Sequence, residues 1–101
     1  MLEDPYRLLV ANAADYAIFT ADIDGVVQTW SPGAERIFGY TESEMQGQSC
    51  DMLFMPEDRD AGVPDLERSL ALHAGRAEDE RWHLRKDGSR FWGAGEYLNK
   101  A

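Results

Sequence analysis

The chain has 101 residues, 44% of them hydrophobic, which is enough for one hydrophobic core and indicates a single domain. Its net charge of -9 excludes nucleic acid and anionic membrane surfaces as partners, because their phosphate groups would be repelled. No apolar run has the length of a bilayer span and no signal-peptide pattern is present, so we expect a cytoplasmic protein.

The first predicted element is an amphipathic flanking helix over residues 1–14, ahead of a domain over residues 15–101. Asp4 can cap this helix, with Pro5 at its first position. Two strand-like runs follow, at residues 16–21 and 26–30, and the sequence DIDG between them suits a tight turn. These runs predict an antiparallel hairpin.

Short helices are predicted next. Ser31 and Pro32 form a helix start, and Thr41 followed by Glu44 has the form of a capping box. Glu44 has a second predicted role as the structural partner of Lys86, and we expect that it cannot fill both roles fully.

A further turn starts at Pro56, and the longest helix is predicted from Pro64 to the residue before Gly75. Leu66 and Leu70 fall on one side of this helix at a spacing of four residues. That spacing predicts that both leucines face the interior.

The last predicted element is a hairpin over residues 81–98, centred on Asp87 and Gly88. A two-residue turn would place Trp82 toward the core, over Gly93, and His83 on the outer face. A bulged turn would reverse both side chains, because a shift of one residue moves each side chain to the other face of a strand. We expect the two-residue turn, with the bulged turn as the alternative.

Two hairpins separated by short helices predict an α+β domain with an antiparallel sheet covered on one face by the helices. Three segments in this order resemble a known family: DIDGVVQTWSPGAERIFGYTESEMQG, LFMPEDR and ERWHLRKDGSRFW. Together they resemble a PAS sensory domain, and they are similar to the PAS domains of bacterial sensor histidine kinases.

The resemblance implies a PAS-like sheet of strand order 2-1-5-4-3 whose fifth strand is absent from this chain, so that residues 15–101 form a C-terminally truncated PAS domain. Unpaired strand edges would favour a homodimer or another form of self-association. It further implies a non-catalytic signalling module of a two-component histidine kinase. Such a module binds a small-molecule ligand between sheet and helices and passes a conformational change to an output domain.

The residues expected to line the interior are the ligand-pocket candidates. They are Ile18, Trp30, Phe38, Met45, Cys50, Leu53, Leu66, Leu70, Trp82, Phe91 and Gly93. No catalytic set, phosphate-binding glycine loop or metal site is recognised in the sequence. An interior that is simply a packed core is the alternative to a ligand pocket.

Cys50 raises the question of a cofactor. In LOV domains, a light-sensing branch of the PAS family, a cysteine in a G-x-N-C-R-F-L-Q motif forms an adduct with flavin, and the matching stretch here is GQSCDMLF. Asp51 replaces the arginine that helps to hold the flavin phosphate, and Gly93 replaces a flavin-contacting asparagine. Flavin is therefore disfavoured and Cys50 is interpreted as a small core residue. A LOV-like photoreceptor or a redox sensor that uses Cys50 remains the alternative.

Haem is the other cofactor that the resemblance brings into question. His73 falls in the last turn of the longest predicted helix, where a histidine is favourable without any ligand role. Haem is therefore also disfavoured, and the cofactor is left unknown, with none expected.

Overall fold

The computed structural model describes residues 16–98, so the helix predicted over residues 1–14 lies outside the described residues. The first hairpin is confirmed. Strand β1 (Phe19–Ala21) pairs antiparallel with strand β2 (Val27–Trp30), and Phe19 lies opposite Trp30.

The turn of this hairpin is held by Asp22. Its carboxylate accepts hydrogen bonds from the amides of Asp24 and Val26, at 2.9 and 3.0 Å. Gly25 completes the turn at a φ of 83°, a conformation that favours glycine. The sequence DIDG is thus a tight turn, as predicted.

Two capped helices follow the hairpin. Helix α2 (Pro32–Phe38) begins after Ser31, whose hydroxyl accepts a hydrogen bond from the Ala34 amide. Helix α3 (Glu42–Met45) begins with a complete capping box. The Thr41 amide donates to Glu44 Oε1 at 2.8 Å, and the Glu44 amide donates to Thr41 Oγ1 at 3.2 Å. The predicted helix starts are confirmed.

The chain then forms a 3₁₀ turn, η1 (Cys50–Leu53), helix α4 (Pro56–Asp60) and the longest helix, α5 (Val63–Ala74), which ends at Gly75. The predicted turn at Pro56 and the predicted long helix are therefore both confirmed.

The prediction that Leu66 and Leu70 face the interior is wrong. Their side chains are 58% and 47% exposed, and the buried face of α5 carries Pro64, Glu67 and Ala71. Glu67 points inward because Arg81, a cationic residue of the second hairpin, forms an ion pair with it. Such a partner is invisible to helical periodicity, which counts only apolar residues.

The second hairpin consists of β3 (Arg76–Leu84) and β4 (Arg90–Leu98). The Arg85 amide donates to Ser89 O at 2.8 Å and the Gly88 amide donates to Arg85 O at 3.0 Å, so three residues form the loop. Gly88 has a φ of 88°, as the bulged three-residue loop requires.

This loop sets the register of the second hairpin. His83 lies opposite Phe91 and Trp82 lies opposite Trp92. His83 is buried and Trp82 is 40% exposed, so the expectation that Trp82 faces the core is wrong and the bulged alternative is observed. The third loop residue shifts the pairing by one position and thereby reverses every side chain of the strand.

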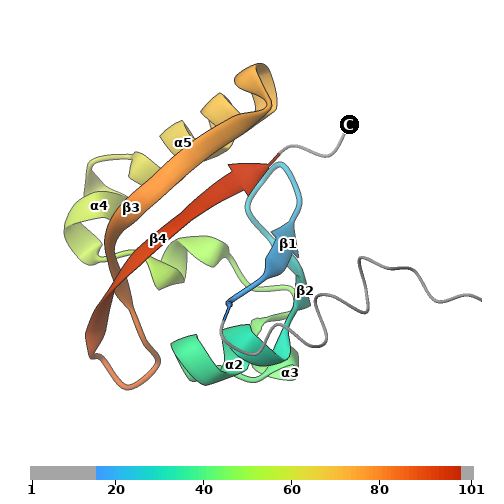
Figure 1. Ribbon diagram of the computed structural model, residues 1–101, viewed down its shortest axis with the longest axis vertical. Helices are drawn as coiled ribbons and strands as arrows, with labels where there is room; N and C mark the ends of the chain where they lie inside the picture. Colours follow the sequence, from blue (N-terminus) through green and yellow to red (C-terminus); the bar gives the residue numbers. More distant parts are fainter. Residues whose placement is uncertain (1–15, 99–101) are drawn as a thin grey trace, which may run out of the picture.

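Figure 1 shows the long β3–β4 hairpin crossing the molecule, with α5 beside β3 and with α2 and α3 next to the first hairpin. Among residues 16–98 the strands form two antiparallel pairs, β1–β2 and β3–β4. The predicted α+β fold of antiparallel strands and short helices is confirmed.

Candidate functional site

Most of the predicted pocket residues lie in or against one buried core. Five belong to the core cluster itself: Trp30, Phe38, Met45, Cys50 and Leu53. Phe91 packs against this cluster, and Ile18 and Gly93 are partly buried. The other three candidates, Leu66, Leu70 and Trp82, lie on exposed surfaces instead.

Aromatic rings connect the two hairpins through this core. The rings of Trp30 and Phe38 lie 5.5 Å apart, and those of Phe38 and Phe91 lie 5.2 Å apart, edge to face. The Trp30 indole donates to the Tyr40 carbonyl at 2.9 Å, so its polar atom is satisfied as well. These contacts make this part of the interior a packed core.

Cys50 is fully buried in this core. Burial raises the pKa of its thiol, although the neighbouring Arg68 acts in the opposite direction. Arg68 Nη1 lies 3.5 Å from the thiol sulfur and 2.7 Å from Asp51 Oδ1, and Nη2 binds Asp65. The thiol is therefore held in its neutral form, while the arginine joins α5 to η1.

A second set of buried side chains is polar and lies between α5 and β3. His83 Nδ1 is 2.9 Å from the Leu53 carbonyl oxygen, and Nε2 is 2.5 Å from Asp79 Oδ1. Both partners are hydrogen-bond acceptors, so an imidazolium ring, with a proton on each nitrogen, satisfies both contacts. His83 thereby links η1 to β3.

Arg81 completes this polar cluster. Its Nε and Nη2 atoms lie 2.9 and 2.8 Å from Glu67 Oε1, its Nε lies 3.4 Å from Asp79 Oδ2, and its Nη1 lies 3.7 Å from Asp58 Oδ2. Only 3% of Glu67 and 7% of Asp79 is exposed. We call Asp58, Glu67, Asp79, Arg81 and His83 the polar cluster.

Sequence reasoning missed most of the polar cluster. Only His83 was considered as an inward residue, because Asp79 and Arg81 stand in a highly charged stretch that is typical of an exposed strand. The signal that could have found them is their alternation with His83, since residues two apart share one face of a strand. The correct turn at Gly88 would have placed all three inside.

The structural pair of Glu44 and Lys86 is present, and Glu44 fills both of its predicted roles. Its Oε1 accepts from the Thr41 amide and its Oε2 lies 2.5 Å from Lys86 Nζ. The expectation that one role would exclude the other is wrong, because each carboxylate oxygen serves one partner. The contacts with Lys86 and Thr41 lower the pKa of Glu44 to about 2.

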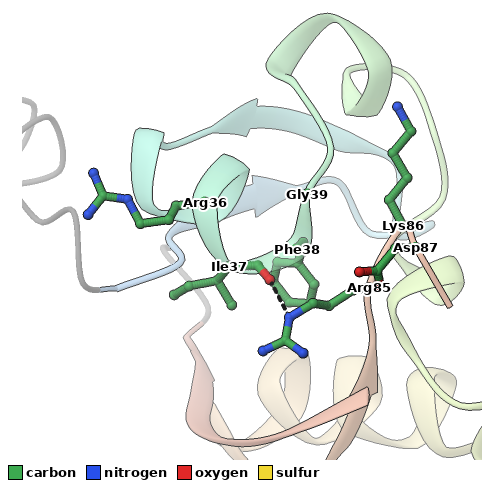
Figure 2. A pocket seen from close by; sticks show the side chains of 7 residues that line it. All are labelled: Arg36, Ile37, Phe38, Gly39, Arg85, Lys86 and Asp87. Carbon is green, nitrogen blue, oxygen red and sulfur yellow. Dashed lines mark hydrogen bonds between the residues drawn. The ribbon is translucent and has the colours of Figure 1, made fainter. Parts of the chain in front are cut away.

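A surface hollow of about 430 Å³ lies between the end of α2 and the β3–β4 loop (Figure 2). Arg36, Arg85 and Lys86 contribute positive charge to its lining. Arg85 Nε donates to the Ile37 carbonyl at 3.0 Å and Lys86 binds Glu44, so both cations already have protein partners. The Arg85 contact docks α2 onto the loop, and the Lys86 contact docks α3 onto it.

No group of three or more His, Cys, Asp or Glu side chains within residues 16–98 is arranged to hold a metal ion. In the same part of the chain, no helix has the length and apolar character needed to cross a membrane.

Comparison with known proteins adds a family. A family model described as PAS domain matches residues 15–95. Over 91 residues the chain is 43% identical to two-component system protein A of Emericella nidulans, covering 90% of this chain and 13% of that protein. The chain thus spans about an eighth of the length of this relative.

Solved structures agree with this match. The PAS domain of a protein from Colwellia psychrerythraea has a TM-score of 0.81 and 25% identity, covering 90% of this chain and 75% of that one. A domain of a sensory box sensor histidine kinase/response regulator from Geobacter sulfurreducens has a TM-score of 0.77 at 22% identity, covering 88% and 75% of the two chains. A light-oxygen-voltage receptor that binds RNA is also similar, with a TM-score of 0.66 and 26% identity over 88% of this chain and 25% of that one.

Proposed function

Because the chain belongs to the PAS domain family, we propose that it is the cytoplasmic sensory module of a two-component signalling protein, a sensor histidine kinase. The observation that carries this proposal is the 43% identity to a two-component system protein across 90% of the chain. The module acts by contact and change of shape, with its signal received in the interior and transmitted to an output domain.

The polar cluster supports an interior sensing site. It joins α4, α5 and β3 through charged side chains, and His83 extends it to η1. Charged hydrogen bonds between elements are sensitive to any small ligand or ion that competes for them. A change in this cluster therefore changes how α5 sits on the hairpin.

The outer face of the β3–β4 hairpin supports a relay surface. Trp82 and Trp92 are 40% and 56% exposed, and their rings meet edge to face at 5.5 Å. Arg90 lies over the Trp82 ring at 4.2 Å. Tryptophan and arginine are the residues that most often anchor protein interfaces, so we assign this face to a homodimer contact.

The second route to self-association rests on strand edges. Within residues 16–98, β1 pairs only with β2 and β4 pairs only with β3. Such edges can pair with another strand, so the predicted self-association stays a prediction with two candidate surfaces.

Domain replacement tests the proposed function. The segment of the Emericella nidulans protein that matches this chain would be exchanged for the 101-residue chain, and phosphoryl transfer by the chimera would be measured. We expect the chimera to retain phosphoryl transfer that a protein lacking the segment has lost. A chimera no more active than the deletion would refute the proposal.

A flavin-binding photoreceptor is the second candidate, because a light-oxygen-voltage receptor is among the similar structures. The residues present do not fit this cofactor. The Cys50 sulfur is enclosed by packed side chains, and Asp51, which stands where the motif has an arginine, presents a carboxylate that Arg68 already binds. Blue absorbance of protein purified in the dark, bleached by light, would revive this candidate.

A further inference from the structure

Glu67 on α5 and Asp79 on β3 each have one carboxyl oxygen with a hydrogen bond and one without. Glu67 Oε1 accepts from Arg81, and Asp79 Oδ1 accepts from His83. The other two oxygens, Glu67 Oε2 and Asp79 Oδ2, are buried and accept no hydrogen bond within residues 16–98; Arg81 Nε approaches Asp79 Oδ2 only as an ion-pair contact. Buried oxygens of this kind normally have a donor.

The two carboxyl groups flank the same guanidinium nitrogen, since Arg81 Nε lies 2.9 Å from Glu67 Oε1 and 3.4 Å from Asp79 Oδ2. Two carboxylates cannot bond without a proton between them, and two buried like charges in contact repel strongly. A single proton on Glu67 Oε2, donated to Asp79 Oδ2, satisfies both oxygens and removes the repulsion. We propose that Glu67 and Asp79 share one proton across the interface of α5 and β3, and that its loss at rising pH loosens α5 from the hairpin.

The pKa shifts agree with this arrangement. Burial, with further contributions from Asp79, raises the pKa of Glu67 to about 8, while Arg81 acts in the opposite direction. Burial alone would raise the pKa of Asp79, but hydrogen bonds from His83 and Glu67 outweigh it and lower that pKa. The proton therefore belongs to Glu67, and Asp79 is the acceptor.

Charged and titratable groups face the pair from each packed element. They are Asp58 of α4, Arg81 and His83 of β3, Tyr97 of β4 and Cys50 of η1. Burial raises the pKa of both Tyr97 and Cys50, so these two groups stay neutral. Arg81 lies close to the carboxylates of Asp58 and Asp79 as well as to Glu67, so one cation already faces the acidic groups of three residues. Loss of the shared proton therefore adds a further buried negative charge that must share this single cation with Asp58 and Asp79.

The direction of the pH effect follows from this shift. The pKa of Glu67 rises from 4.5 to about 8 on folding. Protonated Glu67 therefore stabilises the contact of α5 with the hairpin fully below pH 4.5. This stabilisation declines as the pH rises and is lowest above about pH 8. Between these two pH values the equilibrium constant for release of α5 from the hairpin increases by up to about tenfold per pH unit. The proton as an input to signalling rests on the proposed function, whereas the shared proton itself does not.

Hydrogen exchange of the α5 amides in the 101-residue chain, measured from about pH 5 to 9, tests the proposal. In the wild-type chain we expect protection factors to fall by up to about tenfold per pH unit and to level off near pH 8. In Glu67→Gln, whose amide cannot ionise, this part of the decline disappears. Glu80→Gln, which removes an exposed carboxylate of β3, is the matched control and should behave as wild type.

A second measurement covers the case in which Glu67→Gln does not fold. The carboxyl carbon of Glu67 in the wild-type chain is followed by NMR through the same titration, and we expect a midpoint near pH 8. A midpoint at the ordinary value of a glutamate, or an equal decline of protection in wild type and Glu67→Gln, would overturn the proposal. Failure of the domain replacement would leave this titration unchanged, so the two results can be told apart.

Discussion

Arg81 on β3 donates a hydrogen bond from Nε to Glu67 Oε1 on α5 at 2.9 Å, and its Nη2 lies 2.8 Å from the same oxygen as an ion pair. The same guanidinium approaches Asp79 and Asp58. One cation of the sheet therefore holds acidic side chains from three elements and explains why α5 turns an acidic residue inward.

Replacing Arg81 with methionine should destabilise the chain by about 3 kcal/mol or more, because the buried Asp79 carboxylate loses a counter-charge and Glu67 Oε1 loses its hydrogen-bond donor. Urea unfolding at about pH 6 measures this loss. Arg90→Met is the matched control, because Arg90 stacks on an exposed tryptophan and should lose only about 0.5–1 kcal/mol. Similar losses in both variants would contradict this role of Arg81.

Alanine substitutions at Gly25 and Gly47 test how tightly the Arg68 side chain packs against the first hairpin, with Gly47 as the control position. Both have a positive φ, 83° and 85°, so alanine should strain either position by roughly 1–2 kcal/mol. A Cβ at Gly25 would in addition lie 2.5 Å from Arg68 Nη1, whereas one at Gly47 meets nothing within 4 Å.

We therefore expect Gly25→Ala to lose more stability in urea unfolding than Gly47→Ala. Adding Arg68→Ala to the Gly25 variant should remove the excess, because the clash is then absent. An equal decrease in the free energy of unfolding for both variants would show that the Arg68 side chain moves aside without loss of stability.

Trp30 is buried and Lys86 is exposed, so their side chains should contribute very differently to the stability of the fold. Trp30 is buried and its indole N–H is bonded, so Trp30→Ala should cost about 3–5 kcal/mol. Lys86→Met breaks an exposed ion pair with Glu44 and should cost far less. Thermal unfolding of both variants ranks them, and the reverse order would refute this assignment of the core.

Local signals made the helix starts and turns predictable. Thr41 and Glu44 satisfy each other within one helical turn, and Asp22 closes its turn within four residues, so each pattern contains all of its partners. The inward face of α5 was not predictable in this way. Glu67 is buried because Arg81, fourteen residues later on another element, meets it. The register of Trp82 and His83 likewise depended on one extra loop residue.

The proposed homodimer contact at the exposed tryptophans predicts the effect of substitutions on that face. Trp92→Glu places a charge on the outer face of β4 and should raise the dimer dissociation constant by about tenfold or more, because a central aromatic contact is lost. Ile23→Glu, at an exposed position in the turn between β1 and β2, should leave it unchanged. Sedimentation equilibrium measures both, and equal effects would exclude the outer face as the dimer contact.

The central claim is that this domain passes its signal through contacts of the β3–β4 hairpin in a two-component protein. The most direct measurement compares phosphoryl transfer in the Emericella nidulans chimera carrying the wild-type chain, Trp92→Glu or Ile23→Glu. We predict that Trp92→Glu alters phosphoryl transfer about tenfold, in line with the loss of a central interface residue, and that Ile23→Glu does not. Equal phosphoryl transfer by all three chimeras would contradict the claim.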